Sequence, residues 1–490
     1  MALLTVGPNS EFASIADAMA HANPNDTVQL EAGYSNETAT VTRHGMTITG
    51  EASSTGIVLR LATGVSTVEL GGTAPINLFD AADGNGIVGN AGDNRIQVSA
   101  GVDSVNGGEG HDLLLVDYRL ATGAVTGDSA SNFTEAGGGG RMVTVEGGFE
   151  DFTIWTGSGA DTVTTGDGDD VIRTGEGAGT VNAGQGANVI VGGGGADTIT
   201  GLDGGNLVQG GDGENTITTG GGADRIFSGA DADTIISGAG DDRIAIYGGA
   251  DTAAAGAGSD LLIVDYADAV TAVSGGVASG DNSAGFVGHI ADLDGATLDF
   301  TGVERFHVTT GAGADRILTG AGADLLSAGG GADRFNGGGG ADRMLGQAGD
   351  DRLLGGDGDD RLLGGGGNDD LVGGLGRDVI TGGIGQDNLL FDDGETGATR
   401  ATADVVTDFS QGDGDRINLR FVDADTRSAS VDDAFSFIGT GAFTGVAGQL
   451  RYETVAGTSW VMGDTDGDGA ADLFVRVNGG VALDATDFVF

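Results

Sequence analysis

Apolar side chains recur every nine residues along much of this chain, and the most regular run repeats one nine-residue pattern nine times without a gap over residues 310–390. Within each nine-residue repeat the sixth place is aspartate, the eighth is apolar, and glycine recurs at the second and fourth places. Glycine lets the first six residues form a tight turn, and the last three predict a short strand whose middle side chain points inward. Two repeats then form one 18-residue coil of a parallel solenoid, with coils about 4.8 Å apart.

The aspartates of alternate repeats are predicted to stack into two columns. One column would hold Asp315, Asp333, Asp351, Asp369 and Asp387, and the other Asp324, Asp342, Asp360 and Asp378. Stacked carboxylates repel one another, whereas carboxylate and carbonyl oxygens together are the ligands that Ca²⁺ prefers. The sequence therefore predicts several calcium ions bound between successive turns, and a chain that winds up only when calcium is present.

These repeats match the pattern GGxGxDxUx, in which U is apolar, and the chain resembles the RTX (haemolysin-type) calcium-binding proteins. The resemblance implies an all-β fold, a right-handed parallel β-roll or β-helix solenoid, and a secreted protein. The competing interpretation is a low-complexity glycine tract without fixed structure, which is also the state expected in the absence of calcium.

Two earlier segments repeat the same pattern less regularly. Residues 80–155 contain degenerate repeats followed by a β-rich insert, residues 156–263 form a first roll of twelve repeats, and residues 264–309 form a second insert before the second roll at 310–390. Asparagine or glycine replaces several aspartates of the first roll, which predicts weaker calcium binding there. The remaining candidate ligands are Asp103, Asp112, Asp161, Asp170, Asp197, Asp224, Asp233, Asp242, Asp251 and Asp260.

The motif Val-Asp-Tyr before each insert, at 116–118 and 264–266, indicates a larger internal duplication. We expect both inserts to be lateral β-rich additions, acting either as passive covers or as a binding surface. The first roll also places threonine at the seventh place of alternate repeats, which predicts an exposed ladder. Threonine is β-branched and suits strands, so the ladder is explained either by ordinary strand structure or by an ice-binding surface. Its members are Thr162, Thr180, Thr198, Thr216, Thr234 and Thr252.

Residues 1–79 have a different composition and are similar to the opening of pectin-lyase-like β-helices. Ser10 is the expected cap of a helix whose Phe12, Ile15, Ala16 and Met19 share one face. Strands are expected at 27–30, 39–42, 46–49 and 57–61. The segment is interpreted as a cap on the open end of the solenoid. The resemblance also leaves open a Ca²⁺-dependent polysaccharide lyase or epimerase that uses Arg43, His44 and Arg60.

Residues 391–490 resemble the C-terminal domain of serralysin-type metalloproteases, which implies an uncleaved type I secretion signal ending here in Asp487-Phe488-Val489-Phe490. The chain has no HExxH motif, so the protease itself is not expected. Four aspartates have the spacing DxDxDGxxD, which predicts either a further calcium loop or an acidic hairpin. These aspartates are Asp464, Asp466, Asp468 and Asp472.

Composition narrows the function classes. The formal net charge is −52 with a pI of about 4.1, which disfavours nucleic acid and anionic membranes as partners and favours cations. The chain has no cysteine, no membrane-spanning apolar run and no N-terminal signal peptide pattern. We therefore expect a secreted, non-catalytic calcium-binding scaffold whose partners are calcium, the type I secretion apparatus and a glycan or cell surface.

Overall fold

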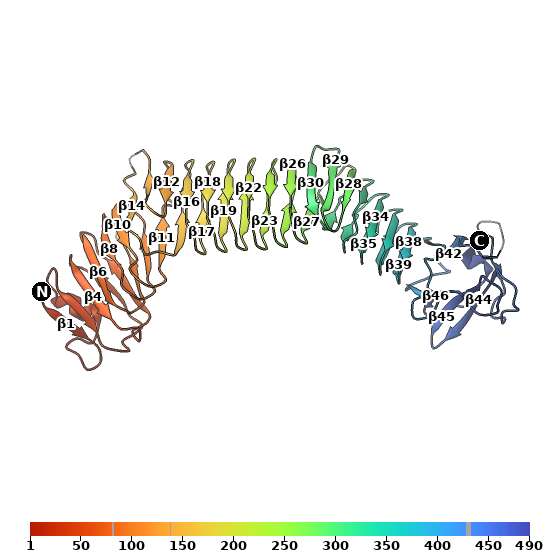
Figure 1. Cartoon of the computed structure of the whole chain (residues 1–490), viewed down its shortest axis with the longest axis horizontal. Helices are drawn as coiled ribbons and strands as arrows, with labels where there is room; N and C mark the ends of the chain where they lie inside the picture. Colours follow the sequence, from red (N-terminus) through yellow and green to blue (C-terminus); the bar gives the residue numbers. More distant parts are fainter. Residues whose placement is uncertain (81–82, 138, 428–432) are drawn as a thin grey trace. The chain divides into compact units, whose positions relative to one another are not determined.

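The computed structural model describes residues 1–80, 83–137, 139–427 and 433–490. Residues 81–82, 138 and 428–432 belong to the predicted degenerate repeats, the first insert and the C-terminal segment, and these parts of the predictions lie outside the described residues. The described chain is almost entirely β-structure and divides into two compact units, Met1–Asp242 and Arg243–Phe490. Within each unit, two strand ladders run along the coils (Figure 1). The predicted all-β solenoid is confirmed.

In the first unit, one ladder, sheet A, takes one strand from most coils. Its strands in spatial order are β1 (Leu3–Val6), β2 (Thr27–Leu30), β4 (Met46–Gly50), β6 (Thr67–Gly72), β8 (Gly86–Val88), β10 (Val102–Asn106), β14 (Met142–Val145), β13 (Asn132–Glu135), β12 (Val125–Asp128), β16 (Thr162–Thr164), β18 (Thr180–Asn182), β20 (Thr198–Thr200), β22 (Thr216–Thr218) and β24 (Thr234–Ile236).

The opposite ladder, sheet B, is parallel throughout this unit. Its strands are β3 (Thr38–Val41), β5 (Ile57–Leu61), β7 (Ile76–Phe79), β9 (Arg95–Val98), β11 (Leu113–Asp117), β15 (Asp151–Trp155), β17 (Val171–Arg173), β19 (Val189–Gly193), β21 (Leu207–Gly211) and β23 (Arg225–Phe227).

The second unit repeats this plan. Sheet A contains β26 (Ala250–Ala254), β30 (Thr297–Val303), β29 (Gly285–Asp292), β28 (Val273–Asp281), β32 (Arg316–Leu318), β34 (Arg334–Gly339), β36 (Arg352–Asp357), β38 (Asp370–Leu375), β40 (Asn388–Asp392), β42 (Arg416–Phe421) and β47 (Phe488–Val489). Sheet B contains β25 (Arg243–Ile246), β27 (Leu261–Asp265), β31 (Arg305–Thr309), β33 (Leu325–Ser327), β35 (Arg343–Ala348), β37 (Arg361–Gly366), β39 (Val379–Ile384), β41 (Asp404–Val406), β46 (Leu473–Asn478), β45 (Thr458–Asp464), β44 (Gln449–Val455) and β43 (Ser436–Phe437).

The core is a narrow file of apolar side chains between the two sheets. The residue at the eighth place of each second-roll repeat is at most 2% exposed, from Ile317 through Leu353 to Leu389. Coils pair at a spacing of 18 residues, as Arg334 with Arg352 and Leu353 with Leu371 show. Both the inward side chain and the coil length therefore agree with the nine-residue pattern.

Both inserts are β-rich, as expected, but their strands do not lie beside the roll as lateral additions. In each insert, three strands join sheet A in line: β12, β13 and β14 in the first, and β28, β29 and β30 in the second. The middle strand is antiparallel to its neighbours, and the outer two pair in parallel with the flanking coils. Within sheet A every insert strand has a hydrogen-bonded neighbour on both sides, whereas a lateral flap would leave a strand edge unpaired.

The N-terminal helix begins later than the sequence suggested. Helix α1 spans Ile15–His21, and the Ser14 hydroxyl, instead of Ser10, accepts a hydrogen bond from the Asp17 amide at 3.0 Å. Ile15, Ala18 and Met19 are its buried residues, whereas Ala16 is exposed. The helix packs against β1 and β3, the first strands of the two sheets, so it covers their outer edges.

Candidate metal centres

Each second-roll aspartate connects its turn to the turn one coil earlier. Oδ1 of Asp333 accepts from the Asp315 amide at 2.7 Å, and Oδ1 of Asp360 accepts from the Asp342 amide at 2.7 Å. The same bond joins Asp369 to Asp387 at 3.0 Å. These carboxylates are at most 3% exposed. The two predicted columns of aspartates are therefore present in the second roll, with one oxygen of each carboxylate held by backbone.

The second oxygen of these carboxylates is buried without a donor. Among the described residues, Oδ2 has no hydrogen-bond partner in Asp103, Asp112, Asp161, Asp170, Asp197, Asp224, Asp315, Asp324, Asp333, Asp342, Asp351, Asp360, Asp369, Asp378 and Asp387. A buried acceptor left in this state costs about 1–3 kcal/mol, and more when it is charged.

In much of the second roll this oxygen faces another acceptor. A β-carbon built on Gly337 would lie 2.9 Å from the Gly355 carbonyl oxygen and closer still to Asp342 Oδ2. The equivalent position beside Gly346 is bounded by Asp351 Oδ2 and the Gly364 carbonyl. Two acceptors thus converge on a gap that no described donor enters.

Burial raises the pKa of these carboxyls. The pKa of Asp342 rises to about 8, and those of Asp351 and Asp378 rise to about 7, from an ordinary value of 3.8. Removal from water is the main cause, and repulsion from neighbouring column members adds to it. Burial therefore disfavours the ionised form of these carboxyls, whereas a divalent cation would stabilise it.

The donor set fits calcium. Carboxylate and backbone carbonyl oxygens are hard ligands, and glycine-rich turns let several of them approach one ion. The second-roll aspartates would contribute Oδ2, and the first-place residue one coil later would contribute its carbonyl oxygen. Calcium would supply charge neutralisation and a bridge between successive coils.

The first-roll aspartates occupy the same kind of position but differ in their neighbours. Oδ1 of Asp161 accepts from the Val125 amide at 2.6 Å, and Oδ1 of Asp170 accepts from the Phe152 amide at 2.7 Å. Hydroxyls of Thr156 and Thr165 lie beside these carboxyls and counteract the rise of pKa that burial causes. The structure also buries Asp103, Asp112, Asp197, Asp224, Asp233, Asp242, Asp251 and Asp260 to 2% exposure or less.

Asparagine replaces the carboxylate in the middle of the first roll and brings its own donor. Nδ2 of Asn206 donates to the Gly204 carbonyl at 3.0 Å and to Asp224 Oδ1 at 3.0 Å. Nδ2 of Asn188 donates to Asn206 Oδ1 at 3.1 Å. A neutral amide therefore takes over part of the role that a cation would have, which supports the prediction of weak calcium binding here.

Four acidic residues that the sequence analysis did not select extend the columns. Asp404 Oδ1 accepts from the Asp378 amide at 2.8 Å, and Asp415 Oδ1 accepts from the Asp387 amide at 3.1 Å. Glu150 accepts from the Asp112 amide, and Glu304 accepts from the Asp260 amide. For Asp415 a signal existed, because GDGDRIN at 412–418 is the end of one more repeat.

The C-terminal acidic loop gathers three of its four predicted ligands. Carboxylate oxygens of Asp464, Asp466 and Asp472 lie within 4.8 Å of one another. Asp468 does not join them, because its Oδ1 accepts from the Ala470 amide at 2.7 Å. Backbone amides already occupy both oxygens of Asp464, at 2.7 and 3.0 Å. The loop is a well-bonded turn between β45 and β46, and its calcium role stays a prediction.

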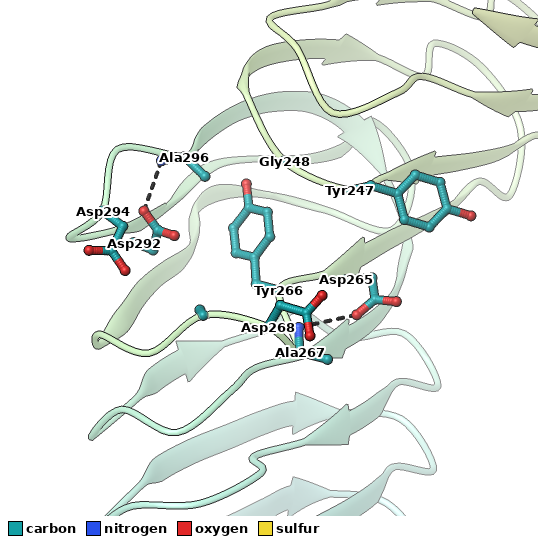
Figure 2. A pocket seen from close by; sticks show the side chains of 10 residues that line it. Tyr247, Gly248, Asp265, Tyr266, Ala267, Asp268, Asp292, Asp294 and Ala296 are labelled. Carbon is teal, nitrogen blue, oxygen red and sulfur yellow. Dashed lines mark hydrogen bonds between the residues drawn. The ribbon is translucent and has the colours of Figure 1, made fainter. Parts of the chain in front are cut away.

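A pocket of about 420 Å³ lies where the second insert leaves the roll (Figure 2). It is lined by Tyr247, Tyr266 and four aspartates, namely Asp265, Asp268, Asp292 and Asp294. Tyr266 is 5% exposed, and its hydroxyl has no hydrogen-bond partner among the described residues. Figure 2 shows this ring between the loop carrying Asp292 and the side chain of Tyr247.

The arginines named for the enzyme alternative have structural partners. Arg43 donates to the carbonyls of Ala22 and Thr42, both at 3.2 Å. The guanidinium of Arg60 lies 4.9 Å from the centre of the Phe79 ring. His44 is exposed. No helix of the described residues is long and apolar enough to cross a bilayer.

Comparison with known proteins identifies the repeats. The family model for the RTX calcium-binding nonapeptide repeat (4 copies) matches residues 82–114, 153–181, 174–208, 209–244, 309–344, 336–371, 345–380 and 363–395. These segments are RTX calcium-binding nonapeptide repeats, which confirms the predicted repeat type and its calcium ligand.

Other comparisons add little. Among solved structures, the chain is similar to the extracellular lipase LipA from Serratia marcescens, with 14% identity and a TM-score of 0.20. The match covers 63% of this chain and 40% of the lipase, so the chain spans less than half of that protein. No curated protein matches the chain.

Proposed function

We propose that this RTX-repeat protein is a secreted, non-catalytic scaffold that folds outside the cell when calcium fills the turns of its rolls. The observation that carries the proposal is the pairing of buried acceptors, as between Asp351 Oδ2 and the Gly364 carbonyl. At millimolar extracellular calcium the ions would stabilise the folded state by mass action. Where calcium is scarce, repulsion within a chain of formal charge −52 opposes the folding of its acidic turns.

Burial of residues 487–488 is consistent with export in an unfolded form. Phe488 pairs within sheet A beside Ile417 and is 6% exposed, and its ring lies 5.1 Å from that of Phe437. Asp487 accepts from Gln411 Nε2 at 2.7 Å. A type I secretion signal in this segment would be accessible only before the domain folds. Low calcium inside the cell would prevent folding and so keep the signal accessible to the secretion apparatus.

The scaffold's partner would bind beside the second insert. The pocket at Tyr266 combines carboxylates, which accept hydrogen bonds from sugar hydroxyls, with tyrosine rings, on which sugar rings can stack. We therefore assign the binding role to this pocket, with a glycan or glycosylated cell surface as the partner. A screen of the calcium-loaded protein against glycans tests this, with Asp292→Asn as the variant expected to weaken binding and exposed Asp357→Asn as the matched control.

A second candidate function rests on the threonine ladder. Thr162, Thr180, Thr198, Thr216 and Thr234 are exposed and lie in register along parallel strands of sheet A. Such a regular hydroxyl and methyl array is compatible with ice binding. Thermal hysteresis that disappears in Thr198→Tyr and Thr216→Tyr would favour this function over the scaffold.

The decisive experiment for the scaffold is a calcium titration of the full chain by circular dichroism at pH 8. We expect β-structure to appear cooperatively in the millimolar range or below, and magnesium to be a poor substitute because it requires near-octahedral geometry. Equal β-content in EGTA and in calcium would refute the proposal.

A further inference from the structure

The first place of the repeat is not the same in the two rolls. It is glycine in most of the second roll, for example Gly346, Gly355 and Gly364, whereas threonine or serine is frequent in the first roll. The hydroxyl-bearing first places that precede a sixth-place aspartate are Thr156, Thr165, Thr219, Ser228, Ser237, Thr310 and Thr319.

Backbone conformation does not explain these glycines. Glycines at the second and fourth places need the left-handed region, as Gly338 at φ +91° and Gly340 at φ +111° show. First-place glycines such as Gly346, Gly355 and Gly364 have no such angle, so any residue fits their backbone. What they provide is space, because a β-carbon would collide with the sixth-place Oδ2 and with the carbonyl oxygen one coil later.

Where the first place is threonine, the hydroxyl occupies this space. Thr319 Oγ1 donates to the Gly337 carbonyl at 2.8 Å, and Thr156 Oγ1 donates to the Thr174 carbonyl at 2.9 Å. Thr165, Thr219 and Thr310 make the same bond across one coil, at 3.1, 2.8 and 2.9 Å. The carbonyl that faces the gap in a glycine repeat is thus already hydrogen-bonded in a threonine repeat.

We propose that the first-place residue decides whether a turn takes a divalent cation. Glycine leaves a gap between a carboxylate and a carbonyl oxygen that calcium bridges, whereas a threonine hydroxyl closes the gap and joins the coils without metal. The calcium sites with both acceptors are then those of Asp197, Asp342, Asp351, Asp360 and Asp369. Beside Gly373 and Gly382 the nearest atoms belong to the carboxylates of Asp378 and Asp387, without the second acceptor. This inference rests on the proposed calcium-dependent folding.

The consequence is a chain with two kinds of roll. Hydroxyls and the asparagine amides hold most of residues 156–245 together without calcium, while residues 337–390 depend on it. Calcium sensing is therefore concentrated in the repeats that directly precede the C-terminal segment in the sequence.

Two reciprocal substitutions in the full-length protein test the inference. Gly355→Thr should close the gap at Asp360 and lower the number of bound calcium ions by one, measured by equilibrium dialysis. Thr319→Gly should open the gap at Asp324 and raise the number by one. Thr319→Val is the matched control, because its branched side chain still fills the space, and its ion count should equal that of the wild type.

The outcomes separate this inference from the proposed function. If the wild type binds calcium but Gly355→Thr and Thr319→Gly leave its ion count unchanged, the first-place rule is wrong and the calcium-folded scaffold stands. If Thr319→Val gains an ion as Thr319→Gly does, the space argument is wrong. If the wild type binds no calcium at its repeats, the proposed function fails as well.

Hydrogen exchange of the wild type gives a test that does not depend on any variant folding. In EGTA we expect amides of residues 156–182 to stay protected while those of residues 337–390 exchange rapidly. Addition of calcium should slow exchange mainly in the latter. Equal loss of protection in both segments on calcium removal would overturn the inference.

Discussion

Asp351→Asn should change stability in opposite directions with and without calcium. Asp351 is 2% exposed, and burial raises its pKa from 3.8 to about 7. With about 1.4 kcal/mol for each pH unit, ionising this carboxyl in the metal-free roll at pH 8 costs on the order of 4 kcal/mol. Asparagine removes that cost, can still accept from the Asp333 amide, and offers an amide donor towards the Gly364 carbonyl.

In calcium the same change removes a ligand. A site held at a hundredfold excess over its Kd contributes about 2.7 kcal/mol to the free energy of unfolding, and this contribution is lost with the site. We therefore expect a gain of roughly 2–4 kcal/mol in EGTA, estimated from the burial cost above, and a loss of about 2–3 kcal/mol in excess calcium.

Urea unfolding at pH 8, followed by circular dichroism, measures both values. Trimethylamine N-oxide, which favours buried states, brings the metal-free protein into the measurable range. Asp357→Asn is the control, because it makes the same charge change at an exposed position and should alter stability by less than about 0.5 kcal/mol in either buffer. A destabilisation of equal size in EGTA and in calcium would refute the reasoning.

Three further predictions follow from the roll. In EGTA, folding should be promoted as pH falls from 8 to 5. Burial raises the pKa of Asp342 to about 8 and of Asp378 to about 7, so the folded state binds more protons than the unfolded one and its stability is lost as pH rises. A β-content that increases with pH would contradict this prediction. Leu362→Ala removes most of a core side chain that is 1% exposed. In calcium it should lower the free energy of unfolding of the second roll, measured in urea, by about 2–5 kcal/mol. A change below about 1 kcal/mol would argue against close packing of the eighth-place side chains. Gly338 has φ +91°, and a β-carbon at this position would collide with the Gly320 carbonyl oxygen. Gly338→Ala should therefore broaden or abolish the cooperative unfolding transition even in calcium. An unchanged transition would show that the turn relaxes.

The sequence was sufficient to predict the coil because its pattern is local and repeated. The spacing of Asp333 and Asp351 gives 18 residues directly, and the apolar Phe335 between them defines which side faces inward. Each coil contacts mainly its neighbours, so the same short-range rules apply at every step.

Features that depend on non-repeated contacts were predicted less well. Ser10 and Ser14 are equally good caps by residue type, and only the packing of Ile15 and Met19 against the first strands selects Ser14. The inserts show strand periodicity, but their in-line pairing depends on partners far away in the sequence. For Asp468, hydrogen bonding within its own turn prevails over the spacing pattern.

The chemistry of the site was predicted only in part. Sixth-place aspartates are visible as a column in the sequence, whereas the space beside Gly346 or Gly355 appears only when coils are stacked. The first-place alternation between threonine and glycine was nonetheless present in the sequence. Asp415 was also detectable there, as the sixth place of one more repeat before Ile417.

Small-angle scattering of the full chain at pH 8, with and without calcium, tests the central claim most directly. The account predicts an expanded second roll in EGTA, a decrease of the radius of gyration on addition of millimolar calcium, and a parallel rise in melting temperature. The same radius of gyration and the same melting temperature in a fully metal-stripped sample would contradict it.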